Sequence, residues 1–264
     1  MFEKIGFIGT GNMGSAVAHA VAGQGRELLL ANRTPAKAQV LADAVGGRVV
    51  KNPEAAGESE LLFLCVKPQM MADMLADIAP MLRARDDRFV LVTMAAGLTC
   101  ESIRDMVDMP CPVIRMMPNT PCAIGAGVIQ YCGLGVTEEE LNEFAALLKP
   151  AGLVDKVEER LIDAASAVSG CGPACAYLFM EALADGAVAC GLPRDKAMAY
   201  AAQMVEGSAR MVLESGKHPG VLKDAVCSPG GTTIQGVRAL EEGGFRAAAM
   251  NAVIKAYEKT LTLK

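Results

Sequence analysis

Residues 4–14 read KIGFIGTGNMG, a short apolar run that passes directly into a glycine-rich turn. The turn has the spacing G-x-G-x-x-G, carried by Gly9, Gly11 and Gly14. Such a turn between a strand and a helix lets the backbone approach a pyrophosphate and aims the helix N-terminus at that anion. Glycine-rich turns after strands also occur for structural reasons alone. The placement after a first strand and before a helix nevertheless favours a dinucleotide-binding site.

The first 130 residues alternate short β-rich runs with segments of helical length, and one further helix and a possible last strand follow before residue 158. Two runs, LLFLCV at 61–66 and FVLVTM at 89–94, are apolar on both faces, which is typical of a parallel sheet covered by helices. This alternation predicts an α/β fold with a doubly wound Rossmann sheet. The strands are expected at 4–8, 27–31, 48–50, 61–66, 89–94, 113–116 and near 153–157, and the helices at 13–22, 35–45, 69–82, 100–107 and 137–148.

From residue 159 onward the sequence reads as helices separated by Gly/Pro breaks, such as GCGP at 170–173 and SPGG at 228–231. We therefore expect two domains, a dinucleotide-binding domain over 1–158 and an all-helical domain over 159–264. The expected helices cover 159–168, 173–190, 194–214, 219–226, 232–242 and 245–259.

The segment 174–190 is rich in alanine and apolar around most of its circumference, unlike a surface helix of a monomer. Burial at the centre of the helical domain and burial against a second subunit both explain this pattern. Because so short a domain encloses little interior of its own, we expect a homodimer built on these helices.

Composition argues against several classes of partner. Lys and Arg total 25 against 30 Asp and Glu, a net charge of −5, which argues against nucleic acid and anionic membrane surfaces. Tryptophan is absent and aromatic residues make up 4%, so a base-stacking platform is not expected. The most apolar stretch, 174–189, contains Glu181 and Asp185 and is shorter than the about 20 residues that span a membrane. No membrane span is therefore expected.

The nine cysteines are scattered singly with no C-x-x-C pair, and the chain has two histidines, so the spacing indicates no zinc site. Cys171 and Cys175, one helical turn apart, are interpreted as small apolar core residues. The first residues, MFEKIGFIG, lack the basic and long apolar regions of a secretion signal. Scattered cysteines without such a signal predict a protein of the reducing cytoplasm.

The second expected strand ends in LANRT at 30–34. A carboxylate at this place would bind the ribose hydroxyls of NAD and repel a 2′-phosphate. The sequence has Asn32, Arg33 and Thr34 instead, an amide, a guanidinium and a hydroxyl that suit a phosphate. This predicts NADPH as the cofactor with NADH as a weaker alternative, unless Arg33 is simply a solvated loop charge.

Three further loops follow strands at the same edge of the predicted sheet, where the nicotinamide would lie. They are CVKP at 65–68, AAG at 95–97 and MPNTP at 117–121. The prolines end the strands and fix the loop backbone, and the small residues of AAG allow close approach of a cofactor. As pure structure, the same loops are ordinary strand-ending turns.

The stretch KDAVCSPGGTT at 223–233 places a Gly-Gly turn before a helix that begins with two threonines. Free backbone N–H groups and hydroxyls at such a helix start suit a small carboxylate. An ordinary capped helix start explains the same residues equally well.

The sequence resembles pyrroline-5-carboxylate reductases over essentially the whole chain. The segments that carry the resemblance are GFIGTGNMGSA, FLCVKPQ, RMMPNTP, SGCGPA and VCSPGGTTIQGVRALEEGGFRAAAMNAV. The resemblance implies a Rossmann domain, a helical dimerisation domain, and a site between the two that the partner subunit completes. It also implies hydride transfer from NADPH or NADH to L-1-pyrroline-5-carboxylate, which gives L-proline in the final step of proline biosynthesis. Some members of the family assemble five dimers into a decamer.

By the same resemblance, the cofactor would contact the glycine loop, the pocket after the second strand, an asparagine on the adenosine side and the loops at the nicotinamide end. These residues are Gly9, Thr10, Gly11, Asn12, Met13, Gly14, Asn32, Arg33, Thr34, Asn52, Val66, Lys67, Pro68, Ala95, Ala96, Gly97 and Asn119. No metal is implied. Cys171 and Cys175 depart from the family's usual residues, which affects local packing rather than chemistry.

The resemblance also places the substrate carboxylate against the Gly-Gly turn, with the hydroxyl of Thr233 near the ring nitrogen. This loop comprises Ser228, Gly230, Gly231, Thr232 and Thr233. If the imine binds already protonated, no strong acid is needed, and the Thr233 hydroxyl orients the nitrogen as the candidate catalytic group. Neither histidine is a candidate acid, because His19 is expected to pack within the first helix and His218 to be exposed in a turn.

GFIGTGNMG is also similar to β-hydroxyacid dehydrogenases and related imine reductases. The hydroxyacid enzymes share a catalytic lysine in a G-x-x-x-K-x-x-x-N pattern, whereas Gly172 here is followed by PACAYLFM and by no lysine before Lys196. A non-catalytic NADPH-binding sensor is a further alternative, but it has no use for the SPGGTT stretch. A six-membered imino acid is an alternative side substrate, since one methylene is worth only about 1–3 kcal/mol in a pocket.

Overall fold

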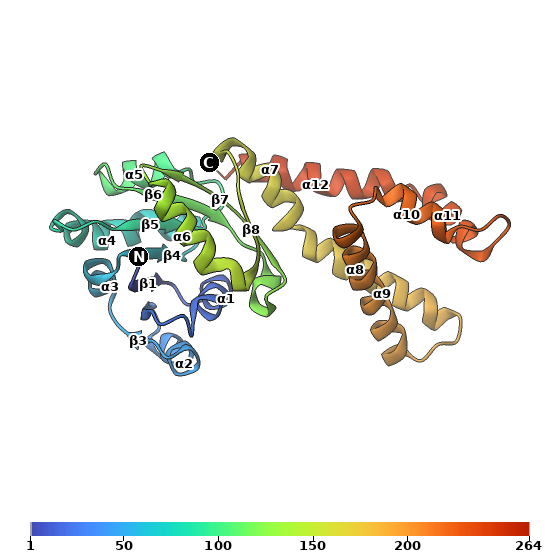
Figure 1. Cartoon of the computed structure of the whole chain (residues 1–264), viewed down its shortest axis with the longest axis horizontal. Helices are drawn as coiled ribbons and strands as arrows, with labels where there is room; N and C mark the ends of the chain where they lie inside the picture. Colours follow the sequence, from blue (N-terminus) through green and yellow to red (C-terminus); the bar gives the residue numbers. More distant parts are fainter. Residues whose placement is uncertain (1, 264) are drawn as a thin grey trace. The chain divides into compact units, whose positions relative to one another are not determined.

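An eight-stranded sheet in the order β3-β2-β1-β4-β5-β6-β7-β8 organises the first part of the chain (Figure 1). The computed structural model describes residues 2–263. Neighbouring strands are parallel except β6 and β7, which pair antiparallel. The strands are β1 (Lys4–Ile8), β2 (Glu27–Ala31), β3 (Arg48–Val49), β4 (Leu61–Leu64), β5 (Val90–Thr93), β6 (Val113–Met117), β7 (Gly127–Leu134) and β8 (Gly152–Lys156).

Helices cover both faces of the sheet, because successive residues of its central strands point to opposite sides and both sides are apolar. On one face, Phe7 and Phe63 stack with ring centroids 4.7 Å apart in a core shared with α1, α2 and α6. On the other face, Leu62 and Leu64 pack in a core with α3, α4, α5 and α7. The helices are α1 (Asn12–Val21), α2 (Pro35–Val45), α3 (Asn52–Glu58), α4 (Met71–Arg83), α5 (Cys100–Val107), α6 (Glu138–Leu148) and α7 (Glu159–Ser169), with 3₁₀ turns η1 (Pro68–Met70), η2 (Thr120–Ile124) and η3 (Lys149–Ala151).

The expected fold class, a doubly wound Rossmann sheet followed by helices alone, is confirmed. Two elements were not predicted. Strand β7 has the sequence GVIQYCGL, in which glycines and a buried glutamine interrupt the apolar pattern. Helix α3 has seven residues, among them Pro53 and Gly57, and is too short to show a helical period.

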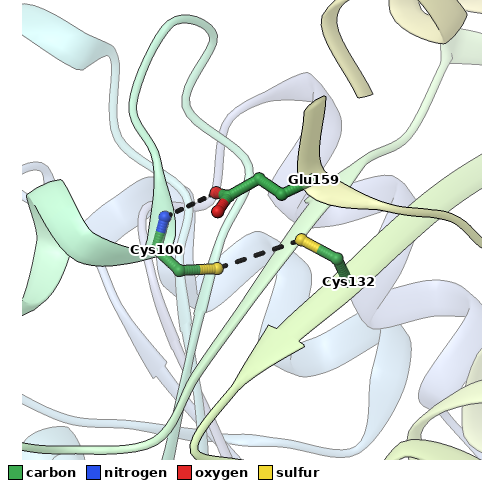
Figure 2. Close-up of side chains that lie close together, drawn as sticks. All are labelled: Cys100, Cys132 and Glu159. Carbon is green, nitrogen blue, oxygen red and sulfur yellow. Dashed lines mark hydrogen bonds between the residues drawn. The ribbon is translucent and has the colours of Figure 1, made fainter. Parts of the chain in front are cut away.

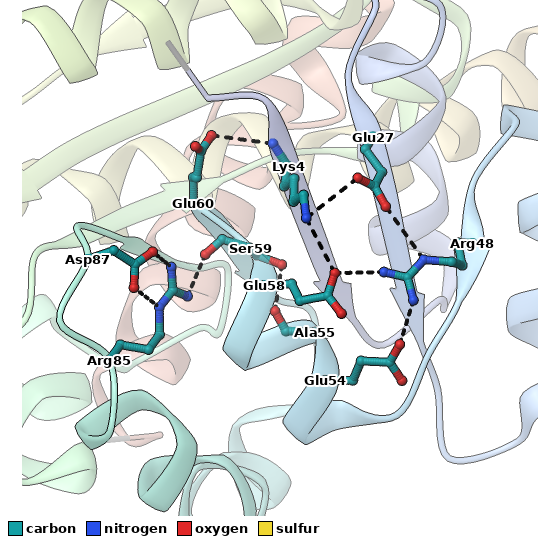
Figure 3. Close-up of polar contacts among 10 residues, drawn as sticks. All are labelled: Lys4, Glu27, Arg48, Glu54, Ala55, Glu58, Ser59, Glu60, Arg85 and Asp87. Atoms are coloured by element: carbon teal, nitrogen blue, oxygen red, sulfur yellow. Dashed lines mark hydrogen bonds and ion pairs between the residues drawn. The ribbon is translucent and has the colours of Figure 1, made fainter.

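The amino ends of the strands carry a network of ion pairs (Figure 3). Arg48, the first residue of β3, lies 2.5 Å from Glu54 and 2.8 Å from Glu58. Lys4, the first residue of β1, lies 3.5 Å from Glu58 and 3.9 Å from Glu27. Each of these charges therefore has an opposite charge beside it.

Residues 172–255 form a second compact unit that consists of helices. All of this unit is described, and three of its residues are buried, namely Ala184, Ala197 and Ala201. Large apolar side chains are exposed instead, including Leu178 at 68% and Leu213 at 80%. Its helices are α8 (Gly172–Ala189), α9 (Arg194–Ser215), α10 (Pro219–Val226), α11 (Thr232–Glu242) and most of α12 (Phe245–Leu261).

The two compact units divide at residues 171 and 255, and the domain boundary expected after residue 158 stays a prediction. Helix α7 belongs to the first unit, because Ile162 is fully buried in the core on one face of the sheet. The residues from Ala256 onward also belong to the first unit. The chain thus leaves the first unit once and returns to it at the end of α12.

The stretch Glu159–Ala189 is long and apolar enough to cross a membrane by length and composition, and 11% of its most apolar window is buried. The expectation that no such stretch exists considered 174–189 alone, and α7 extends that segment toward the N-terminus. Core helices and subunit interfaces meet the same criterion, so composition alone does not decide between them.

Three single-residue expectations were wrong. Cys171 and Cys175, interpreted as core residues, are both exposed in the chain. His19, expected to pack, is exposed because the buried face of α1 is carried by neighbours such as Val17 and Val21. His218 is exposed as expected, and its Nδ1 accepts the backbone N–H of Gly220 at the start of α10.

Candidate active site

The glycine loop between β1 and α1 has a backbone that requires glycine at its first position. Gly9 has φ +106°, and a Cβ at this residue would lie 2.6 Å from the carbonyl oxygen of Cys65. The Gly9 N–H donates to the Ala31 carbonyl, which fixes the loop to the end of β2. Cys65, the first residue of the CVKP loop, packs under the glycine loop, and burial raises the pKa of its thiol. Cys65 is therefore an uncharged packing residue.

The start of α1 presents hydrogen-bond donors without protein acceptors. Gly11 is the N-cap and contributes no side-chain bond, so the N–H groups of Asn12, Met13 and Gly14 lack a capping acceptor. The Thr10 hydroxyl is buried without a hydrogen-bond partner in the described structure. Unsatisfied donors at a glycine-bounded helix start fit a bound pyrophosphate.

Asn32 joins the glycine loop to the loop after β2. Its Oδ1 accepts the N–H of Thr10 at 3.2 Å, and its Nδ2 donates to the Thr34 carbonyl at 3.0 Å. A carboxylate here would keep the first bond and lose the second. Thr34 is the N-cap of α2, and its side chain makes no cap bond. Arg33 is exposed and has no ion-pair partner among residues 2–263.

A depression of about 630 Å³ opens beside this loop. Arg33 and Lys51 are its basic residues, and sequence reasoning missed Lys51. Its acidic residues are engaged, because Glu54 pairs with Arg48 and Asp77 accepts the Asn52 amide at 3.3 Å. The depression is lined by Asn32, Arg33, Pro35, Val49, Val50, Lys51, Asn52, Pro53, Glu54 and Asp77.

The loops after β4 and β5 lie at the same carboxyl edge of the sheet, because β1, β4 and β5 are parallel neighbours. Val66, Lys67 and Pro68 lead into η1, and Lys67 is exposed. In the other loop, Ala95 is buried and Ala96 is half-buried. Gly97 has φ +80°, and a Cβ there would lie 3.0 Å from the Cβ of Leu263.

Asn119 is buried, and the protein itself uses both ends of its amide. Its Nδ2 donates to the Ser169 carbonyl at 3.0 Å, and its Oδ1 accepts the Val128 N–H at 2.9 Å. These bonds hold β7 and the end of α7 beside the loop after β6. The structure therefore gives Asn119 a structural role, with one amide hydrogen left over.

The predicted substrate loop lies in the second unit and forms a tight turn. Gly230 has φ +69°, and the Gly231 N–H donates to the Ser228 carbonyl at 3.0 Å. Gly231 is the N-cap of α11 and provides no side-chain bond, so the N–H groups at Thr232 and Thr233 lack a capping acceptor. Both threonines are exposed. The structure thus shows an uncapped helix start here rather than a capped one.

Two family models match the chain. One, described as pyrroline-5-carboxylate reductase dimerisation, covers residues 159–263. The other, described as NADP oxidoreductase coenzyme F420-dependent, covers residues 4–97, which include the glycine loop and the depression.

Relatives extend this match to nearly the full length. The pyrroline-5-carboxylate reductase of Escherichia coli K12 is 40% identical over 266 residues, covering 98% of both chains. The chain belongs to the pyrroline-5-carboxylate reductase family. The structure of the Plasmodium falciparum pyrroline carboxylate reductase with NADP bound has a TM-score of 0.88 at 32% identity, covering 98% of this chain and 97% of that one. The Coxiella burnetii pyrroline-5-carboxylate reductase has a TM-score of 0.89 at 29% identity, covering 98% of each.

Membership of the pyrroline-5-carboxylate reductase family gives the apolar surface of the second unit a physical reason. The dimerisation model covers all of 172–255, in which three alanines are buried. It also covers Glu159–Ala189, the stretch apolar enough for a membrane. A dimerisation domain exposes apolar side chains in the isolated chain and covers them on association.

Proposed function

We propose that this protein, an NAD(P)H-dependent oxidoreductase, reduces L-1-pyrroline-5-carboxylate to L-proline by hydride transfer to the C=N bond, the final step of proline biosynthesis. The observation that carries the proposal is a pair of uncapped helix starts, at Gly11 and at Gly231. The first suits the pyrophosphate of a dinucleotide, and the second suits a small carboxylate. The Escherichia coli relative is named for this activity.

NADPH is the preferred cofactor. The loop after β2 has no carboxylate to repel a 2′-phosphate, and Asn32 is engaged in ordering that loop. Within residues 2–263, Arg33 and Lys51 are the cations beside the depression that have no ion-pair partner, while Glu54 is neutralised by Arg48. When bound, NADPH supplies the hydride.

The substrate carboxylate binds at the start of α11, against Ser228, Gly230, Gly231 and Thr232. Thr233 orients the ring nitrogen of the protonated imine through its hydroxyl. His218 is already engaged, because its Nδ1 accepts the Gly220 N–H at the start of α10. Val66, Lys67, Pro68, Ala95, Ala96 and Gly97 lie at the nicotinamide end, with the Asn119 amide ordering the neighbouring loop.

The active unit is a homodimer in the cytoplasm, and association of five dimers into a decamer is the further step that family resemblance implies. The exposed apolar side chains of 172–255 support the dimer. Nine free cysteines support a reducing compartment. Sedimentation velocity would separate monomer, dimer and decamer, and a stable monomer would contradict the proposal.

The first test is the loss of reduced-nicotinamide absorbance on addition of pyrroline-5-carboxylate, with NADPH and NADH in parallel. Rapid loss with NADPH is expected, with a slower loss with NADH. Equal rates would remove the argument for the 2′-phosphate pocket and keep the reductase. Folded protein that binds NADPH without turnover would favour a sensor.

Thr233→Ala is expected to slow hydride transfer by about 100-fold, the size of the loss when a reacting group is misplaced by about 1 Å. Affinity for NADPH should stay nearly unchanged. Single-turnover absorbance measurements report the hydride step directly. Thr233→Ser is the matched control, because it retains the hydroxyl and should retain most of the rate. Unchanged turnover in Thr233→Ala would remove Thr233 from the mechanism.

A further inference from the structure

Two cysteines and a glutamate from three separate elements meet inside the first unit (Figure 2). Cys100 is the first residue of α5, Cys132 lies in β7, and Glu159 is the first residue of α7. Their potential ligand atoms all lie within 4.8 Å of one another. Both cysteines are buried, at 0% and 8% exposed, whereas the Glu159 side chain is 35% exposed.

We propose that Cys100, Cys132 and Glu159 form a binding site for a zinc ion. The two Sγ atoms are 4.0 Å apart. Two thiolates at about 2.3 Å from one tetrahedral zinc ion lie about 3.8 Å apart, so the cysteines need almost no movement. A disulfide would require a separation of about 2.05 Å, which means moving sulfur atoms by a total of about 2 Å inside a packed core. The separation therefore fits a shared ion and not a disulfide.

The charges around the three side chains suit the exchange of protons for zinc. Arg115 lies opposite Cys132 in the β6–β7 pairing and forms ion pairs with Glu159, at 3.7 Å, and with Asp163 of α7. Zinc binds thiolates, so uptake of one ion releases a proton from each thiol. Two positive charges then replace two protons, and the net charge of the buried cluster is unchanged.

Glu159 supplies the third ligand and the route from solvent. Its Oε1 accepts the backbone N–H of Cys100 at 2.7 Å, which leaves further acceptor positions on the carboxylate for an ion. Because this side chain is partly exposed, water can reach the fourth coordination position. The ion would join α5, which begins just after the Ala95–Gly97 loop, to β7 and α7.

The test uses the full chain, stripped with a chelator under reducing conditions and titrated calorimetrically with Zn²⁺. We expect one equivalent per chain, release of protons, and a raised Tm. The Cys100→Ser/Cys132→Ser double variant should lose this equivalent. Cys171→Ser/Cys175→Ser is the matched control, because it removes an exposed cysteine pair one helical turn apart and should keep the equivalent.

Titration with Co²⁺ gives an independent readout on the unaltered chain, which covers the case that the double variant does not fold. We expect thiolate-to-cobalt charge-transfer absorption with the intensity that two thiolate ligands give. Glu159→Gln keeps an acceptor for the Cys100 N–H and should weaken zinc binding by at least about 10-fold. Absence of this absorption, or loss of the zinc equivalent in the Cys171/Cys175 variant alone, would overturn the proposal.

Discussion

The two edges of the sheet differ in how they treat charge. At the amino edge, Lys4 and Arg48 lie among glutamates, so each charge is compensated within the protein (Figure 3). At the carboxyl edge, the helix α1 start is uncapped, the Thr10 hydroxyl has no partner in the described structure, and Arg33 is unpaired within residues 2–263. The amino edge compensates its charges within the protein, whereas the carboxyl edge presents N–H donors and a cation that fit an anionic ligand.

The largest effect is expected from Gly9→Ala at the carboxyl edge. Alanine would have to adopt φ +106° and place its Cβ 2.6 Å from the Cys65 carbonyl oxygen. We expect the free energy of unfolding to fall by about 2–4 kcal/mol and NADPH affinity to fall at least about 10-fold. Urea denaturation and fluorescence titration measure the two quantities.

Gly23→Ala is the matched control for this change. Gly23 has φ +74° but has no atom within 4 Å of an added Cβ. Gly23→Ala should lower the free energy of unfolding by about 1–2 kcal/mol, because alanine would have to adopt the left-handed backbone, and NADPH affinity should be retained. Equal loss of NADPH affinity in both variants would show that general destabilisation, and not the loop, is responsible.

The second effect concerns selectivity between cofactors. Arg33→Ala should raise the Kd for NADPH by roughly 10- to 100-fold, because a charge-assisted hydrogen bond is worth about 1.5–3 kcal/mol. The Kd for NADH should change less than about twofold, since it has no 2′-phosphate. Lys37→Ala, on the exposed face of α2, is the control. Equal weakening of both cofactors would place Arg33 away from the 2′-phosphate.

A third, smaller effect tests the amino edge through pH. Glu140 receives two hydrogen bonds from Arg88, at 2.7 and 2.8 Å, which lower its pKa to about 2 from 4.5. The Arg88–Glu140 interaction therefore stabilises the folded state fully above pH 4.5, and this contribution to the free energy of unfolding is lost as the pH falls toward 2. Because Arg88 is half-exposed, its removal in Arg88→Ala should cost about 1 kcal/mol at pH 7.

Urea denaturation of wild type and Arg88→Ala between pH 7 and pH 2 measures this contribution. The difference between the two proteins should shrink steadily below pH 4.5, with NADPH affinity at pH 7 unaltered. A difference that persists at the lowest pH would mean that Arg88 acts through packing rather than through the Glu140 carboxylate.

The smallest effect is expected from Lys4→Met at the amino edge. The side chains of Lys4 and Glu27 are 44% and 45% exposed, so their ion pair is screened by water. The unfolding free energy should fall by less than about 1 kcal/mol, and NADPH affinity should not change. A loss of cofactor affinity here would break the distinction between the two edges.

Local patterns predicted most of the first unit. β1, β2, α2 and α5 begin and end at the expected residues, because apolar runs and Gly/Pro breaks bound them. β7 was missed, since its pairing with β6 is antiparallel and its sequence alternates weakly. The fold class followed from the alternation of strands and helices, which the one missed strand, β7 between β6 and β8, does not change.

The candidate active site was likewise predictable only where its residues are contiguous in the sequence. The glycine loop and the α11 start follow from contiguous motifs and could be read directly. The place of Asn119 beside the cofactor stays a prediction, whereas its hydrogen bonds to Ser169 and Val128, residues distant in the sequence, could not be predicted. The proximity of Cys100, Cys132 and Glu159 was invisible for the same reason, because three elements must first fold together.

The packing of Leu263 against Gly97 bears on how the protein is made. Of the described residues, Leu263 emerges last from the ribosome, whereas Gly97 emerges far earlier. The Ala95–Gly97 loop therefore remains without one of its neighbours until translation of this segment is finished. A nascent chain that stalls within the helical unit would therefore carry the Ala95–Gly97 loop without its contact to Leu263.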